Sequence, residues 1–414
     1  MRAHFVGRYP FCGGHPRNAP EQRRPKMTYD FNTITDRKGT NAIKYDLALA
    51  RGKPADALPL WVADMDFPTA PEILKALHDK VSHGIFGYSA PCEDFYEAVK
   101  KWQKEEHDFS VERKWIVTTP GVVFAIVSAI RAFTEKGEAV LIQTPVYYPF
   151  KNMILANERK LVTSSLFEKE GKWQIDFEDF ERKIVENDVK LFILCSPHNP
   201  VGRVWRREEL ERISEICLRH KVLVFADEIH NDFVYEPDRH TVYQTISKEA
   251  AENSILATSA SKTFNLAGLQ FSTIFIQNPQ LRARFQDARN ATGYDEPNLM
   301  GLVATQAAYE HGKDWLTALK AHLSSNLDFL RRYLKEKLPR VRLIEPEGTY
   351  LVWLDFSDYG YSDSELDDLI VHKAKLWLDR GSMFGCEGQG YQRMNIATLR
   401  PLLEEALNRL SSVF

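Results

Sequence analysis

The chain has 414 residues, of which 44% are hydrophobic and 27% charged, and its formal net charge is -3 at pH 7. This composition is typical of a soluble globular protein and excludes a disordered or fibrous chain. The near balance of 54 basic and 57 acidic residues argues against nucleic acid as a partner. No run approaches the roughly 20 apolar residues that a membrane helix needs, so we expect no membrane partner.

The cysteines are few and dispersed, and no CxxC pair occurs. The five are Cys12, Cys92, Cys195, Cys217 and Cys386. An odd, scattered set predicts reduced thiols and a cytoplasmic protein rather than a disulfide framework. We expect no bound metal ion.

The first 26 residues differ in composition from the rest of the chain. Residues 1–26 are rich in arginine, proline and glycine, contain Glu21 as their one acid, and lack the apolar core of a secretory signal. We interpret them as a disordered N-terminal extension without chemistry, ranked above a transit peptide.

Between about residues 115 and 277, short apolar runs alternate with amphipathic stretches. Strands are expected over 139–143, 161–165, 191–195, 222–226, 255–259 and 273–276. Continuous apolar runs are typical of strands that are covered on both faces. Helical periodicity over 122–134 and 208–219 predicts two helices that would cover the sheet. The fold class is therefore α/β, with a mostly parallel sheet covered by helices on both faces.

After about residue 280 the pattern changes. Helices are expected over 314–337, 364–379 and 401–411, and a strand over 349–355. We expect a large domain over 76–313 and a smaller α+β domain over 314–414, which residues 27–75 join.

Polar residues follow three successive predicted strands. Asn199 lies in SPHNPVG, Asp227 begins DEIH, and Lys262 lies in SASKTF. Ligands of open α/β sheets collect at the carboxyl ends of the strands, so these side chains are expected to meet in one crevice. Each motif alone has an ordinary explanation, because Asn-Pro is a common turn and an aspartate after a strand often caps a helix.

Taken together, SPHNPVG, ADEIHNDF and SASKTFNLAGLQ resemble fold-type-I pyridoxal-phosphate enzymes of the class I and II aminotransferase superfamily. Six further motifs resemble its branch of MalY/PatB-type cystathionine β-lyases, which cleave carbon–sulfur bonds. They are DRKGTNAIKYD, LPLWVADMDFP, HGIFGYS, TPGVVFAI, TPVYYPF and GSMFGCEGQGYQRMNIA.

The resemblance implies that pyridoxal phosphate binds covalently to Lys262, which also acts as the general base. It places the Asp227 carboxylate at the pyridine nitrogen and the Asn199 amide at the phenolic oxygen of the ring. Tyr147 would stack on the ring. His230 stands where aminotransferases commonly carry a tyrosine, and an ordinary core histidine is an equally good interpretation.

For the phosphate, the resemblance implies a loop at Gly121, Val122 and Val123, at the start of a helix. Ser259 and Ser261 are expected to add hydroxyl groups. Many aminotransferases place an arginine eight residues after the lysine, but this chain has Gln270 there. Tyr88, from a second subunit, is therefore expected to contact the phosphate as a third catalytic residue besides Lys262 and Asp227.

Arg393 matches the arginine that holds the substrate carboxylate, with Asn199 beside it. The implied function is a carbon–sulfur β-lyase that converts cystathionine or related cysteine S-conjugates to a thiol, pyruvate and ammonia. An aminotransferase is the alternative. A cofactor-binding regulator ranks lower, because 1–26 is too short for a DNA-binding module. The expected partners are an amino-acid substrate and a second copy of the chain, in a homodimer with shared sites.

Overall fold

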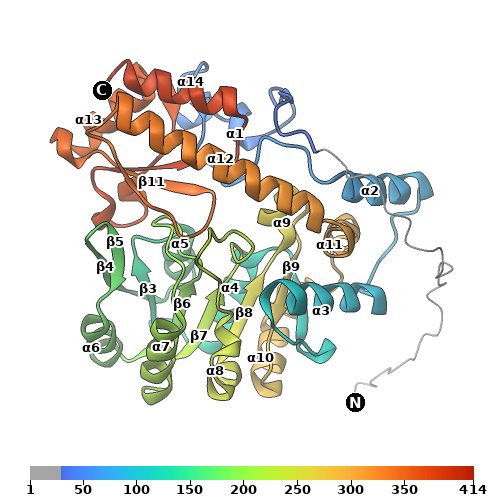
Figure 1. Cartoon of the computed structure of the whole chain (residues 1–414). Helices are drawn as coiled ribbons and strands as arrows, with labels where there is room; N and C mark the ends of the chain where they lie inside the picture. Colours follow the sequence, from blue (N-terminus) through green and yellow to red (C-terminus); the bar gives the residue numbers. More distant parts are fainter. Residues whose placement is uncertain (1–28) are drawn as a thin grey trace, which may run out of the picture.

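A computed structural model describes residues 29–414, and a twisted sheet covered by helices occupies its centre (Figure 1). The extension predicted for residues 1–26 lies outside the described residues. The strand order is β2-β9-β8-β7-β6-β3-β4-β5. In that order the strands span Ile116–Thr119, Ser272–Phe275, Ser254–Thr258, Leu223–Asp227, Val189–Cys195, Ala139–Thr144, Lys160–Lys169 and Lys172–Ile175. Neighbours from β8 to β4 pair in parallel, whereas β9 and β5 run antiparallel to their neighbours.

Helices cover both faces of this sheet, as the apolar runs predicted. The helices α4, α5 and α10 lie over one face and span Val122–Phe133, Pro149–Ala156 and Pro279–Asn290; α6, α7 and α8 lie over the other and span Phe177–Asn187, Arg207–Arg219 and Lys248–Glu252. In β3, Val140 and Ile142 join the core that contains α4. Ala139 and Leu141 join the core that contains α6 and α7. Successive side chains thus enter opposite cores, because strand side chains alternate between faces.

The C-terminal part forms a second, antiparallel sheet in the order β10-β11-β14-β13. These strands span Arg342–Ile344, Leu351–Asp355, Tyr391–Asn395 and Asp379–Arg380. The helices α12 (Lys313–Lys337) and α14 (Arg400–Ser411) lie beside one another above it in Figure 1. The remaining α-helices are α1 (Ile43–Asp46), α2 (Pro71–His83), α3 (Glu93–His107), α9 (Ala260–Thr263), α11 (Leu299–His311) and α13 (Asp363–Asp368).

The helix predicted over 364–379 is wrong in its second half. The helix α13 ends at Asp368, a π-helical turn follows over Leu369–Lys373, and Lys375 has a positive φ of 53°. The chain then forms β12 (Leu376–Trp377), which pairs in parallel with β1 (Leu58–Pro59). This partner lies more than 300 residues away, so a local pattern could not reveal it. Within residues 29–414, no helix is both long and apolar enough to cross a membrane.

Candidate functional site

A pocket of about 290 Å³ opens where β6, β7 and β8 end. The residues predicted for the site that line it are Gly121, Val122, Val123, Tyr147, Asn199, Asp227, His230, Ser261 and Lys262. The convergence has a simple origin: β6, β7 and β8 are parallel neighbours, so their carboxyl ends lie at one edge of the sheet.

Lys262 lies in the single turn α9, which follows β8. Ser259 begins that turn, and its Oγ accepts a hydrogen bond from Ser261 N at 3.1 Å. The Lys262 Nζ donates to the Ala63 carbonyl at 2.8 Å. Burial lowers the pKa of Lys262 to about 8, although Asp64 and Asp227 oppose the change. The amine is therefore a better nucleophile and base near neutral pH than an exposed lysine.

Asp227 is the last residue of β7, and its side chain is buried. Its Oδ1 accepts a hydrogen bond from Ile229 N at 3.1 Å, and no side chain among residues 29–414 donates to it. Burial raises the pKa of Asp227 to about 7, against the attraction of Lys262. The carboxylate therefore lies in the pocket without a cationic hydrogen-bonding partner.

Arg393 joins the site through Asn199. It lies in β14, is 3% exposed, and its Nη1 donates to Asn199 Oδ1 at 3.0 Å. Its Nη2 donates to the Trp61 carbonyl at 2.7 Å and forms an ion pair with Asp379. The Nε of Arg393 is buried without a partner among the described residues. A polar edge of the guanidinium thus remains for a ligand.

The other end of the pocket is formed by the start of α4. Gly121 is the N-cap residue, with φ 128° and ψ 160°, a conformation open to glycine and strained for other residues. The unpaired amide groups of a helix N-terminus favour anions. Ser261 and Gln270 also line this pocket, whereas Ser259 does not. The Ser259 Oγ is instead occupied by Ser261 and by the Phe271 carbonyl.

Tyr147, which follows β3, and His230, which follows β7, both line the pocket. Burial raises the pKa of Tyr147, so its hydroxyl stays protonated. Burial lowers the pKa of His230 to about 3, and its Nδ1 has no partner among residues 29–414. His230 is thus a buried, neutral residue that faces the pocket. Its burial is that of a core histidine, and its place in the pocket lining is that of a site residue, so the two interpretations made from the sequence remain open.

Tyr88 is the one predicted residue that lies apart from the site of its own chain. It follows α2 in the 84–92 loop, and its side chain is 96% exposed. Its predicted contact with a neighbouring subunit stays a prediction.

Three residues of the site were missed in the sequence. The Ala63 carbonyl accepts from Lys262 and, at 3.2 Å, from the Tyr350 hydroxyl. Asp379 faces Arg393 because β13 pairs with β14 in a register that sets these two residues opposite one another. The WVADMDF motif was the available signal for Ala63. No local signal marks Tyr350 or Asp379, because both depend on how the second sheet pairs.

The chain matches the family model for aminotransferase class I and II over residues 55–410. It is 40% identical to cystathionine β-lyase PatB of Bacillus subtilis over 92% of this chain and 99% of that protein. The crystal structure of cystalysin from Treponema denticola, which contains pyridoxal 5'-phosphate, superposes with a TM-score of 0.90. It is 36% identical and covers 94% of this chain and 99% of that one.

A second solved structure, the pyridoxal-phosphate-bound C–S lyase of Staphylococcus hominis, has a TM-score of 0.86 and 32% identity. The superposition covers 94% of this chain and 98% of that chain. The family model spans most of the chain, and the relatives match it nearly end to end. The chain therefore belongs to the class I and II aminotransferase family.

Proposed function

We propose that the protein is a pyridoxal-phosphate-dependent carbon–sulfur β-lyase that acts on cystathionine or a related cysteine S-conjugate. The observation that carries this proposal is the convergence of Lys262, Asp227 and Asn199 on one pocket, with Arg393 bound to Asn199. The similarity to a cystathionine β-lyase and to the structure of a C–S lyase favours lyase over aminotransferase activity.

The residues of the pocket fit the cofactor in charge as well as in position. Asp227 is a buried carboxylate without a cationic donor, and a protonated ring nitrogen would supply one. The amide groups at the start of α4, at Gly121, Val122 and Val123, suit the phosphate. We assign Ser261 and Ser259 to the same end, Tyr147 to the ring face, and His230 to the ring's surroundings.

The proposed chemistry divides between the cofactor and the chain. Pyridoxal phosphate, when bound, supplies an electron sink for the negative charge that develops at the substrate Cα. Lys262 would hold the cofactor and, once the substrate amine is bound, its own amine would remove the Cα proton. Asp227 would keep the ring nitrogen protonated. Arg393 and Asn199 bind the substrate carboxylate and so orient the Cα–H bond toward Lys262.

The Cβ–S bond then breaks, and sulfur leaves with the bonding electron pair and takes up a proton to become a thiol. The remaining three-carbon unit reacts with water to give pyruvate and ammonia. An aminotransferase would share the removal of the Cα proton but would keep the carbon–sulfur bond.

Product analysis tests this proposal. The purified protein is incubated with cystathionine or another cysteine S-conjugate, and separately with an amino donor plus a keto acid. We expect thiol, pyruvate and ammonia in equal amounts from the first reaction and slow exchange in the second. Amino-group exchange without thiol release would establish the aminotransferase instead. A protein that takes up no pyridoxal phosphate would overturn both.

We also propose a cytoplasmic homodimer in which Tyr88 of each subunit completes the site of the other. Val81, Ile85, Phe86 and Tyr88 are each more than half exposed and lie close together in the sequence, at the end of α2 and in the loop after it. Exposed apolar groups in such a run favour a protein contact.

Residues 76–313 and 314–414 are proposed as the large and small domains, with 27–75 joined to the latter through the pairing of β1 with β12.

A further inference from the structure

The 61–67 segment, with the sequence WVADMDF, passes the pocket at Ala63 and belongs to no helix or strand. The Ala63 carbonyl accepts a hydrogen bond from Lys262 Nζ at 2.8 Å. A backbone without a hydrogen-bonded ladder of its own needs other partners to fix the direction of its carbonyl groups. The place of the Lys262 amine therefore depends on the groups that hold residues 62–64.

Side chains from distant parts of the chain hold the two ends of the 61–67 segment. At its start, Arg393 Nη2 donates to the Trp61 carbonyl at 2.7 Å. At its end, Asn265 Nδ2 donates to the Met65 and Phe67 carbonyls at 3.0 and 2.9 Å. The Asn265 Oδ1 also accepts from Met65 N at 3.0 Å. These contacts leave the carbonyl groups of residues 62–64 to other partners.

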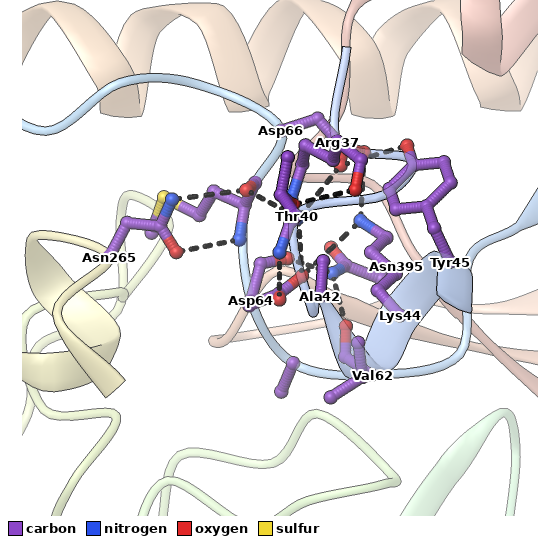
Figure 2. A network of polar contacts seen from close by, with 12 residues as sticks. Arg37, Thr40, Ala42, Lys44, Tyr45, Val62, Asp64, Asp66, Asn265 and Asn395 are labelled. Carbon is purple, nitrogen blue, oxygen red and sulfur yellow. Dashed lines mark hydrogen bonds and ion pairs between the residues drawn. The ribbon is translucent and has the colours of Figure 1, made fainter. Parts of the chain in front are cut away.

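A charge cluster of Arg37, Lys44, Asp64 and Asp66 anchors the side chains of the segment (Figure 2). Arg37 contacts Asp64 at 2.6 Å and Asp66 at 3.1 Å, and Lys44 contacts Asp66 at 2.8 Å. Arg37 Nη1 also donates to the Met65 carbonyl at 3.2 Å. The cluster thus holds the two carboxylates and the end of the segment, rather than the carbonyl groups beside Ala63.

Asn395 binds the two carbonyl groups that flank Ala63. Its Nδ2 donates to the Val62 carbonyl at 2.7 Å and to the Asp64 carbonyl at 2.6 Å (Figure 2). No other side chain among residues 29–414 donates to either carbonyl. The Asn395 Oδ1 accepts from Ala397 N at 2.7 Å, and the side chain is fully buried. One amide, itself held in a fixed orientation, therefore sets the backbone on both sides of Ala63.

The strand β14 explains why this amide reaches the segment. Asn395 and Arg393 lie two residues apart in β14, so their side chains project from the same face of the strand. Arg393 reaches the Trp61 carbonyl, and Asn395 reaches the next stretch of the same segment. One strand thus holds both the arginine proposed to bind the substrate carboxylate and the backbone that receives the Lys262 amine.

We propose that Asn395 is a positioning residue for Lys262. It holds the carbonyl groups on both sides of Ala63 and so directs the Ala63 carbonyl at the lysine amine. When the amine is not bonded to the cofactor, this carbonyl keeps it where it can meet the Cα–H bond of a substrate. The role deepens the proposed lyase activity and rests on it in taking Lys262 as the general base. Asn395 is not part of the pocket lining and acts through the 61–67 segment.

The first test uses cofactor-free protein, so that it does not depend on the reaction catalysed. The pH dependence of acetylation at Lys262 is measured by mass spectrometry of the peptide that carries it. Asn395→Ala removes the bridge but keeps the charged groups that act on the amine, which are Asp64, Asp227 and Arg393. The displaced Ala63 carbonyl would stabilise the ammonium form less, so the apparent pKa of the amine should fall by about one unit.

Asn326→Ala is the matched control. The Asn326 Nδ2 likewise bridges two carbonyl groups, those of Ile396 and Thr398, at 2.9 and 2.8 Å, and its side chain is also fully buried. Loss of either amide should therefore lower the free energy of unfolding by a comparable amount. Only Asn395→Ala should change the Lys262 profile, because Asn326 binds the chain after β14 and not the 61–67 segment.

A second readout is the division between kcat and KM in the cofactor-loaded enzyme. Asn395→Ala should lower kcat by roughly 10- to 100-fold, because a misplaced amine meets the Cα–H bond less often. KM should change little, since Arg393 still binds the substrate carboxylate. Asn326→Ala should keep both constants near their wild-type values.

An unchanged Lys262 pKa in the Asn395→Ala protein, or an equal fall in the Asn326→Ala protein, would overturn the positioning role. If Asn395→Ala does not fold, Asn395→Gln and Asn326→Gln decide by the same comparison, because the longer side chain displaces the carbonyl groups it binds. A Lys262 profile that changes in Asn395→Gln alone would support the role. The expected Lys262 shift in a protein without lyase activity would count against the proposed function alone.

Discussion

Burial changes the ionisation of three side chains in the pocket, each toward its uncharged form. It lowers the pKa of Lys262 to about 8 and of His230 to about 3, and it raises the pKa of Asp227 to about 7. Desolvation alone explains the common direction. A ligand with a cationic ring nitrogen would lower the pKa of Asp227 again, because the positive charge would stabilise the carboxylate.

Replacement of Lys262 by alanine is expected to abolish the visible absorbance of the bound cofactor and to lower turnover by roughly 10²–10⁴-fold or more, since the general base is lost. Absorbance spectra and pyruvate release measure the two effects. Lys75→Ala, at an exposed lysine paired with Asp79, is the matched control and should behave as wild type. A coloured, active Lys262→Ala protein would refute the assignment.

Asp227 predicts a pH dependence of stability in the cofactor-free protein. Its pKa is 3.8 in the unfolded chain and about 7 in the fold, so the native state binds a proton that the unfolded state lacks between these values. Stability from this group is present below pH 3.8 and is lost as the pH rises through 7. Three pH units correspond to at most about 4 kcal/mol.

The free energy of unfolding of Asp227→Asn, minus that of the wild-type protein, should therefore be larger at pH 8 than at pH 5. Urea unfolding of both cofactor-free proteins at the two pH values measures this difference. A difference that does not vary with pH would contradict the raised pKa. In the loaded enzyme the same substitution should lower kcat far more than substrate affinity, because the carboxylate acts on the transition state.

At the scale of single elements, the start of α4 links backbone conformation to ligand binding. Gly121→Ala forces a side chain onto a residue with φ 128°, which costs about 1–3 kcal/mol. The same change should displace the first amide groups of α4 and weaken cofactor binding, as equilibrium dialysis would measure.

Asp176→Ala is the matched control for this prediction. Asp176 caps α6 by accepting from the amides of Glu178 and Asp179 at 3.1 and 3.0 Å, on the face of the sheet that α4 does not cover. Its loss should cost about 1 kcal/mol and leave cofactor affinity unchanged. Equal effects of both substitutions on affinity would show that α4 acts through stability alone.

Element prediction succeeded where the signal is local. The periodicity over 122–134 and 208–219 corresponds to α4 and α7 within one or two residues. The pattern over 364–379 failed after residue 373, because the pairing of β12 with β1 competes with the helix. The strands β2 and β5, each of four residues, were not predicted, although β9, which is equally short, was.

At the scale of the whole molecule, the exposed 84–92 loop predicts a shared site. Lys262→Ala and Tyr88→Ala proteins should each be severely impaired. Mixed under conditions that exchange their subunits, they should recover activity at one site of each mixed dimer, roughly one quarter of wild-type activity. Activity is assayed before and after exchange. An active monomer in sedimentation, or no recovery in verified mixed dimers, would contradict the shared site.

By itself, the sequence determined the α/β class, the positions of the main strands along the chain and the motif positions of Lys262, Asp227 and Asn199. These features are local: apolar runs specify buried strands, and the residues that follow parallel strands must share one edge of the sheet. The resemblance of those motifs identified the family, which the match over residues 55–410 confirms.

The tertiary structure decided which distant groups surround those residues. Asp379 reaches Arg393 through the register of β13 and β14, and the Ala63 carbonyl reaches Lys262 across 199 positions of sequence. The anchoring of Asp64 by Arg37 and Lys44 likewise depends on a segment that has no regular structure of its own. Such contacts leave no periodic trace in the chain, because they arise only when separately formed elements pack together.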